Sequence, residues 1–151
     1  MTYDDLLIES DRNHLITKEK ALRANKGRIK GNRIAINREL TRREKKCVLA
    51  EELGHYYTTA GDILDQSDTG SRKQEYRARL LAYDRLIGLV GIVDAYKHGC
   101  RSRYEIAEHL DVTEAFLQET LEAYRAKYGL CTQLADYIIY FDPLGVLELQ
   151  S

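Results

Sequence analysis

The sequence predicts an α+β fold that is mostly helical with a small β-sheet. Charged and apolar residues alternate on both sides of a Gly-Asn pair in residues 28–36, and several later segments combine helical apolar spacing with capping residues. A β-rich apolar run, YIIYF, occupies residues 137–141. A chain of 151 residues with 44% hydrophobic content can bury one sizeable core. We therefore predict a single domain over residues 1–151.

The helices are predicted from caps and apolar spacing. Thr41 and Glu44 form a T-x-x-E capping box, in which each side chain binds a helix-start amide, and the helix that follows should run to about residue 60. Ser71 and Gln74 predict a second capping box, opening a helix from residue 72 to about 87. Further helices are expected at residues 3–12, 89–98, 104–109 and 113–127.

Two segments are predicted to form strands. Residues 28–30 and 33–36 flank Gly31 and Asn32, which is typical of a β-hairpin with one buried and one basic face. Residues 137–141, stopped by Asp142-Pro143 and followed by 146–149, are expected to form an edge or return strand. This strand is a candidate third member of the hairpin sheet.

The charges are distributed unevenly along the chain. Residues 18–46 contain twelve Lys and Arg but three Glu, although the formal net charge of the whole chain is −1. Such a basic segment could face an acidic partner or nucleic acid, but a solvated surface is the commoner arrangement. The rest of the chain is therefore acidic.

The cysteines and the hydropathy pattern indicate a cytoplasmic protein. Cys47, Cys100 and Cys131 are widely spaced and form no C-x-x-C pair, which argues against a disulfide framework or a Cys-based zinc finger. No apolar run approaches 18 residues, and the acidic start MTYDDLLIES has no basic leader. Neither a membrane span nor an export signal is expected.

The segment CVLAEELGHYYTTA, residues 47–60, carries the candidate chemistry. Within it, Glu51, Glu52 and His55 have the spacing of the zinc-peptidase motif H-E-x-x-H, with glutamate in place of the first histidine. Residues four apart lie on one side of a helix, so Glu51 and His55 can face one ion while Glu52 reaches a water beside it. An exposed i, i+4 pair is the simpler interpretation of the pentapeptide alone.

A third ligand is expected from the next predicted helix. Glu75 opens the pattern E-x-x-A-x-x-x-A, in which Ala78 and Ala82 would allow close packing on the motif helix. A catalytic zinc ion usually has three protein ligands and one open position. Three converging carboxylates would repel one another by on the order of 1 kcal/mol per pair, a cost that a divalent cation removes.

The motif segment, with KGNRIAINREL upstream and RKQEYRARLLAY downstream, resembles the ImmA/IrrE family of metallo-endopeptidases, especially its small prophage and mobile-element members. The resemblance covers residues 27 to 146. It implies a minimal zincin-like metallopeptidase fold and an activity that cleaves a helix-turn-helix repressor. It implies that Glu52 is the general base and that His55 and Glu75 bind the metal. Glu51 occupies the position of the first histidine ligand, and either Tyr56 or Tyr57 is a candidate to stabilise the oxyanion.

Glu51 bears on the choice of metal. The resemblance implies Zn²⁺, but a carboxylate in place of an imidazole lowers the charge of the site by one and makes bound Zn²⁺ a poorer Lewis acid. Two carboxylates and one imidazole also suit a harder ion such as Mn²⁺. A catalytically weak or inactive protein that binds the repressor without cutting it is therefore the main alternative.

A DNA-binding module is a second alternative. Residues 104–117 resemble a helix-turn-helix, with Thr113 capping the second helix. That helix carries Glu114, Glu119 and Glu122, which would face phosphates with negative charge. Direct binding of nucleic acid is therefore not expected, and the expected partner is a protein substrate.

Overall fold

Side-chain caps determine where the first two helices begin. The computed structural model describes residues 1–59 and 68–150, with the backbone alone for 68–71. Helix α1 (Tyr3–Arg12) follows Thr2, whose hydroxyl accepts the Asp5 amide at 3.1 Å. Helix α2 (Arg42–Thr59) follows the predicted capping box, in which Thr41 and Glu44 each accept the other's amide at 3.1 Å. The predicted end of this helix near Gly61 lies outside the described residues.

A three-stranded sheet packs against α2. Strands β2 (Gly27–Lys30) and β3 (Arg33–Asn37) form the predicted antiparallel hairpin, and β1 (Ile16–Lys20), which was not predicted, pairs in parallel with β3. The strand order is β1-β3-β2. Ile34 and Ile36 are buried on the inner face. Any Cβ on Gly27 would lie 2.4 Å from Val48 of α2, so this glycine permits close packing.

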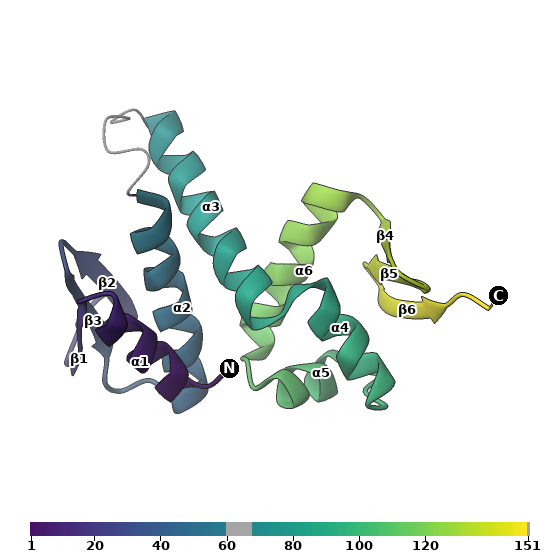
Figure 1. Cartoon of the computed structure of the whole chain (residues 1–151), viewed down its shortest axis with the longest axis horizontal. Helices are drawn as coiled ribbons and strands as arrows, with labels where there is room; N and C mark the ends of the chain where they lie inside the picture. The colour runs from purple at the N-terminus through teal and green to yellow at the C-terminus, as the bar shows by residue number, and fades with distance from the viewer. Residues whose placement is uncertain (60–67, 151) are drawn as a thin grey trace. The chain divides into compact units, whose positions relative to one another are not determined.

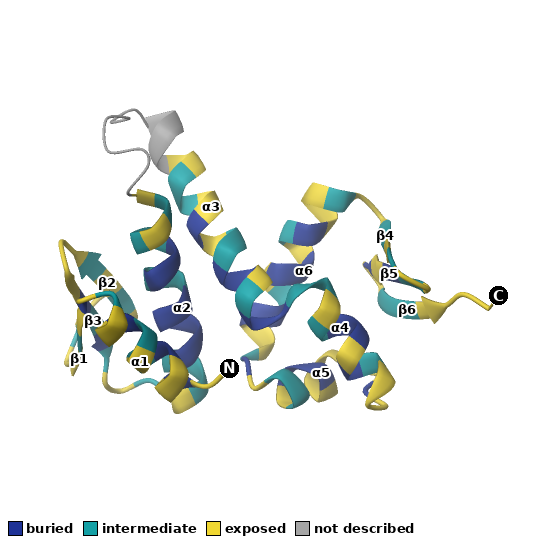
Figure 2. Cartoon of the chain, in the orientation of Figure 1, coloured by how far each residue is buried: buried dark blue, intermediate teal, exposed yellow. Residues whose placement is uncertain are grey.

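The chain divides into two compact units, Met1–Ala82 and Tyr83–Ser151. In the first unit, α2 lies between the sheet and helix α3 (Asp68–Leu86), as Figure 1 shows. Five consecutive residues of α2, from Lys46 to Ala50, are buried, and Leu53 and Gly54 are buried one turn later. Five residues span more than one helical turn, so the middle of α2 is enclosed on all sides, as the dark blue part of this helix in Figure 2 shows. The predicted capping box at Ser71 is wrong, because the backbone is already helical from Asp68.

The second unit contains the end of α3, three further helices and a second sheet. The three further helices are α4 (Gly88–Lys97), α5 (Arg103–Leu110) and α6 (Glu114–Tyr128), close to their predicted bounds. Strands β4 (Cys131–Leu134), β5 (Tyr137–Phe141) and β6 (Leu144–Glu148) pair in the order β4-β5-β6. The predicted strand at 137–141 is therefore confirmed, but its placement at an edge and in the hairpin sheet is wrong. Short turns let β5 pair with its chain neighbours on both sides.

The α+β fold class is confirmed, since helices dominate and the sheets are small. The structure divides into two compact units, and the assignment of residues 1–151 to a single peptidase domain stays a prediction. Within the described part of the chain, no helix is both long and apolar enough to cross a membrane.

Candidate active site

Residues His55 and Glu75 join helices α2 and α3 at the predicted site. The His55 Nε2 atom lies 3.2 Å from a carboxylate oxygen, Oε2, of Glu75. The imidazole is 24% exposed and the carboxylate 43% exposed, so solvent can reach the pair. The structure therefore brings together two residues that are 20 positions apart in the sequence and were both predicted as metal ligands.

Small residues allow the two helices to approach closely at this point. Gly54, next to His55, is buried against α3: a Cβ at Gly54 would lie 2.3 Å from the carbonyl oxygen of Ala78. Ala78 and Ala82 are fully buried, as their spacing on the predicted helix suggested. This approach of the backbones places the His55 and Glu75 side chains within contact distance of each other.

Glu52 combines burial with nearby negative charge. Burial raises the pKa of this carboxyl from its ordinary 4.5 to about 7, and the neighbouring carboxylates of Glu51 and Glu75 contribute in the same direction. A carboxyl with a pKa near neutrality can both accept and return a proton at physiological pH. Glu52 therefore has the acid-base property that the predicted general base needs.

Arg79 is a member of the site that was not predicted. Its Nε atom donates to Oε1 of Glu75 at 3.1 Å, while Oε2 of the same carboxylate faces His55. Each oxygen of the Glu75 carboxylate therefore has its own partner, Arg79 for Oε1 and His55 for Oε2. The i, i+4 spacing of Glu75 and Arg79 is a signal that would have identified this positioning role.

Glu51 lies one helical turn before His55 and therefore on the same side of α2. Its charge contributes to the raised pKa of Glu52, so it belongs to the same electrostatic cluster. Within residues 1–59 and 68–150, however, no three or more His, Cys, Asp or Glu side chains are arranged to hold a metal ion. The structure thus brings His55 and Glu75 into contact, and the three-ligand set with Glu51 stays a prediction.

The two candidate tyrosines differ in their surroundings. The Tyr57 hydroxyl donates to Oε2 of Glu9 at 2.6 Å and accepts from the Asn13 amide at 3.1 Å, so it is held by α1 and the residue after it. Tyr56 packs edge-on against the Tyr57 ring. Its hydroxyl is the better candidate for an oxyanion, because that of Tyr57 is engaged with α1.

The family model of the IrrE N-terminal-like domain, an M78 peptidase domain, matches residues 11–122. The chain belongs to this family. A search of curated proteins gave no match. The matched segment runs from the end of α1 into α6 and so contains the hairpin, the motif helix and Glu75.

Members of the M78 family are in general zinc-dependent metallopeptidases. The donors found here fit a divalent cation, because an imidazole nitrogen and a carboxylate oxygen already face each other across two helices. Burial is the main cause of the raised pKa of Glu52, and the carboxylates of Glu51 and Glu75 add to it, so a cation at this point would offset part of the cost of ionising Glu52. His55 and Glu75 are therefore the residues that would hold the ion.

Proposed function

We propose that this protein is a metal-dependent endopeptidase that cleaves a helix-turn-helix repressor of a prophage or mobile element. The observation that carries the proposal is the contact between His55 and Glu75 beside Glu52, a half-buried glutamic acid whose pKa is about 7. Membership in the M78 family supports the peptidase class. The repressor substrate rests on the resemblance to the ImmA/IrrE family.

In this mechanism His55 and Glu75, with Glu51 as the proposed third ligand, would hold the ion, and Arg79 orients the Glu75 carboxylate. A bound Zn²⁺, or Mn²⁺ as the alternative, supplies Lewis acidity to the site. Glu52 accepts a proton from the attacking water as the water oxygen bonds to the scissile carbonyl carbon. It then gives this proton to the leaving amide nitrogen as the C–N bond breaks, which yields a carboxylate and an amine.

The proposal also places the protein in the cytoplasm, where a prophage repressor acts. Cys47, Cys100 and Cys131 form no disulfide with one another, and the first two are buried, which supports a reducing compartment. The protein substrate is the proposed partner.

The decisive experiment removes the proton-accepting group. Glu52→Gln should keep the fold and metal binding but lower cleavage of a helix-turn-helix repressor that the wild-type protein cuts by about 10²–10⁴-fold, the usual contribution of a general base. Glu39→Gln, an exposed glutamate outside the site, is the matched control and should cleave normally. Full cleavage by the Glu52→Gln protein would refute the mechanism.

A non-catalytic repressor-binding protein is the second candidate, because Glu51 replaces the first histidine of the motif. Incubation of the wild-type protein with the repressor, with and without added metal, separates the two functions. Cleavage fragments that depend on metal support the peptidase, whereas a stable complex without fragments supports binding alone.

A further inference from the structure

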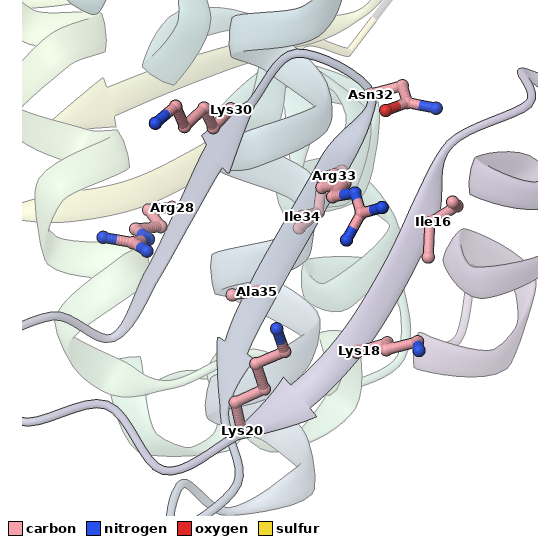
Figure 3. A pocket seen from close by; sticks show the side chains of 9 residues that line it. All are labelled: Ile16, Lys18, Lys20, Arg28, Lys30, Asn32, Arg33, Ile34 and Ala35. Carbon is pink, nitrogen blue, oxygen red and sulfur yellow. The ribbon is translucent and has the colours of Figure 1, made fainter.

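The outer face of the first sheet, on the side away from α2, gathers positive charge. Pleating sends alternate residues to opposite faces of a strand, and the outward positions here are mostly basic. Figure 3 shows the hollow that these side chains line, with a volume of about 350 Å³. Its basic members, called here the cationic face, are Lys18, Lys20, Arg28, Lys30 and Arg33.

The strand register gives the cationic face the form of a trough. Lys18 of β1 and Arg28 of β2 both pair with Ala35 of β3, so the two cations flank a small central residue. Adjacent strands are about 4.8 Å apart, which places the backbones of β1 and β2 about 10 Å apart across β3. Lys20 and Lys30 extend the two rims, and Arg33 stands at one end of the trough floor.

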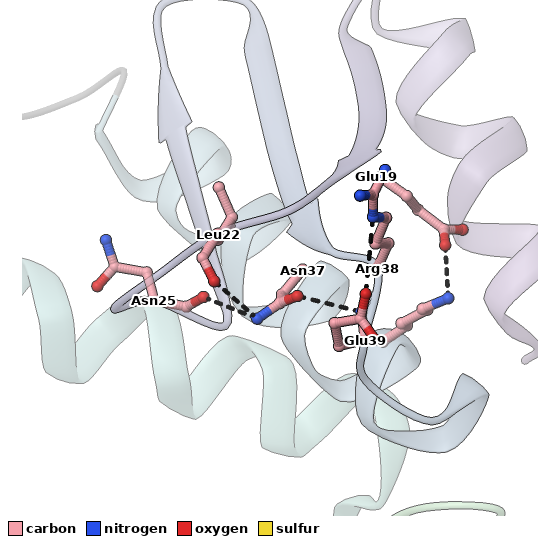
Figure 4. A network of polar contacts seen from close by, with 7 residues as sticks. Glu19, Leu22, Asn25, Asn37, Arg38 and Glu39 are labelled. Carbon is pink, nitrogen blue, oxygen red and sulfur yellow. Dashed lines mark hydrogen bonds and ion pairs between the residues drawn. The ribbon is translucent and has the colours of Figure 1, made fainter.

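Carboxylates are absent from the lining of this trough. The one acidic residue of β1, Glu19, points to the opposite face, where it binds Lys45 and the Tyr3 hydroxyl. Figure 4 shows Glu19 together with the hydrogen bonds that the Asn37 side-chain amide donates to the backbone oxygens of Leu22 and Asn25. Among the described residues, no carboxylate forms an ion pair with any of the five cations.

The chemistry of the cationic face matches a phosphodiester backbone better than a peptide. Lysine and arginine side chains donate hydrogen bonds and accept none. The phosphates of the DNA backbone offer only acceptors, whereas an acidic peptide also presents backbone N–H donors. Alternate residues along a strand are about 6.6 Å apart, so successive cations can follow successive phosphates. The lining contains no aromatic side chain on which an unpaired base could stack.

We propose that the cationic face binds the backbone of duplex DNA without sequence preference. It is a different surface from α5 and α6, whose exposed Glu114, Glu119 and Glu122 remain unsuited to phosphates. Binding of this kind would hold the protein on the DNA that a repressor occupies, but it rests on the sheet alone and needs neither metal nor peptidase activity.

The test measures fluorescence anisotropy of a labelled 20-base-pair duplex of random sequence with metal-free full-length protein at 50–200 mM salt. Five phosphate contacts predict a slope of about −4 to −5 for log K against log salt, and therefore a loss of affinity of a few hundred-fold over this range. Lys18→Gln/Lys30→Gln should bring the slope to about −3 and weaken binding at 100 mM salt by about tenfold or more. Arg12→Gln/Lys73→Gln removes the same charge from exposed positions outside the face and should bind like wild type.

Each other outcome overturns the proposal. Equal loss in both double variants would mean that only the overall charge matters. The face would be assigned to another polyanion if single-stranded DNA bound more tightly than the duplex. The same would follow if poly-glutamate competed as effectively as unlabelled duplex. Circular dichroism of the variants checks the fold, and cleavage of DNA-free repressor by Lys18→Gln/Lys30→Gln should be unchanged, so a failure of DNA binding leaves the proposed peptidase function intact.

Discussion

At the scale of single residues, Glu52 is the group on which the chemistry depends. Burial and the charges of Glu51 and Glu75 together raise its pKa to about 7. In the metal-free protein, ionising this carboxyl destabilises the folded state. A bound cation would reduce this free-energy cost. The same residue therefore links stability, metal binding and proton transfer.

The stability of the metal-free protein should depend on this titration. The folded-state pKa of Glu52 lies above its ordinary value of 4.5, so the folded protein binds more protons between the two values and its stability falls as pH rises from about 4.5 to 7. Glu52→Gln should remove up to roughly 3 kcal/mol of this penalty above pH 7 and little below pH 4.5. Urea unfolding from pH 4 to 8 with a chelator measures the difference, and Glu39→Gln should follow the wild-type curve. A constant difference across this range would contradict the assignment.

Glu51 should determine the preference for the metal. Glu51→His restores two imidazoles at i, i+4 spacing, raises the net charge of the site by one and favours the borderline-soft Zn²⁺ over Mn²⁺. We expect zinc affinity to increase by about tenfold, equivalent to about 1.4 kcal/mol. Competition with a zinc-binding dye measures this affinity. Unchanged affinities for both ions would show that residue 51 is not a ligand.

At the scale of helices and strands, the site depends on the contact between α2 and α3. His55 and Glu75 meet because Gly54 lets α2 lie against the backbone of α3 at Ala78. The fully buried Ala78 and Ala82 supply the other half of this contact. Close packing of helices at small residues thus sets the distance between the two proposed ligands.

Enlarging Gly54 should disturb this contact. In Gly54→Ala, the added methyl group would meet the Ala78 carbonyl oxygen at 2.3 Å, so the helices must shift, at a cost of about 1–3 kcal/mol. Gly91→Ala is a matched helical control, because its Cβ would meet Leu110 at an ordinary 3.5 Å and alanine favours a helix by roughly 0.5–1 kcal/mol. Thermal unfolding and zinc titration compare the two proteins. Equal stability and equal zinc affinity would show that the approach at Gly54 does not position the site.

At the scale of the whole molecule, the most basic surface and the acidic helix α6 belong to different compact units of the chain. The cationic face lies in the unit Met1–Ala82, which also contains the candidate active site, whereas the acidic α6 lies in the unit Tyr83–Ser151. The family match extends across both units, from residue 11 to 122. Metal binding in the first unit should therefore be measurable as stabilisation of the full-length protein.

Zinc at one hundred times its Kd should stabilise the wild-type protein by about 2.7 kcal/mol, which corresponds to a rise in Tm of about 5–10 °C for a chain of this size. His55→Ala and Glu75→Ala should each lose most of this rise. His109→Ala is the control, because His109 and Asp94 form a comparable pair, at 3.0 Å, within the other unit, Tyr83–Ser151. A zinc effect retained in both site variants would remove these residues from the ligand set.

Elements with strong local signals were predictable from the sequence. The capping box at Thr41, the hairpin around Gly31 and the cap at Thr113 each depend on residues within a few positions of one another. The Ser71 capping pattern was wrong because favourable local spacing did not prevent the helix from starting earlier, at Asp68. Strand β1 was missed because it has only one apolar residue, Ile16, and is stabilised by parallel pairing with β3.

The sequence by itself determined the candidate residues of the site, because Glu51, Glu52 and His55 share one helix and their spacing is a property of that helix. Only the tertiary structure decided that Glu75 contacts His55, that Arg79 supports it and that the basic residues of three strands share one face. These arrangements join segments far apart in the chain, and the packing of Gly54 on Ala78 and the pairing of β1 with β3 set their distances. Local spacing specifies which groups are available, and packing between elements specifies which of them meet.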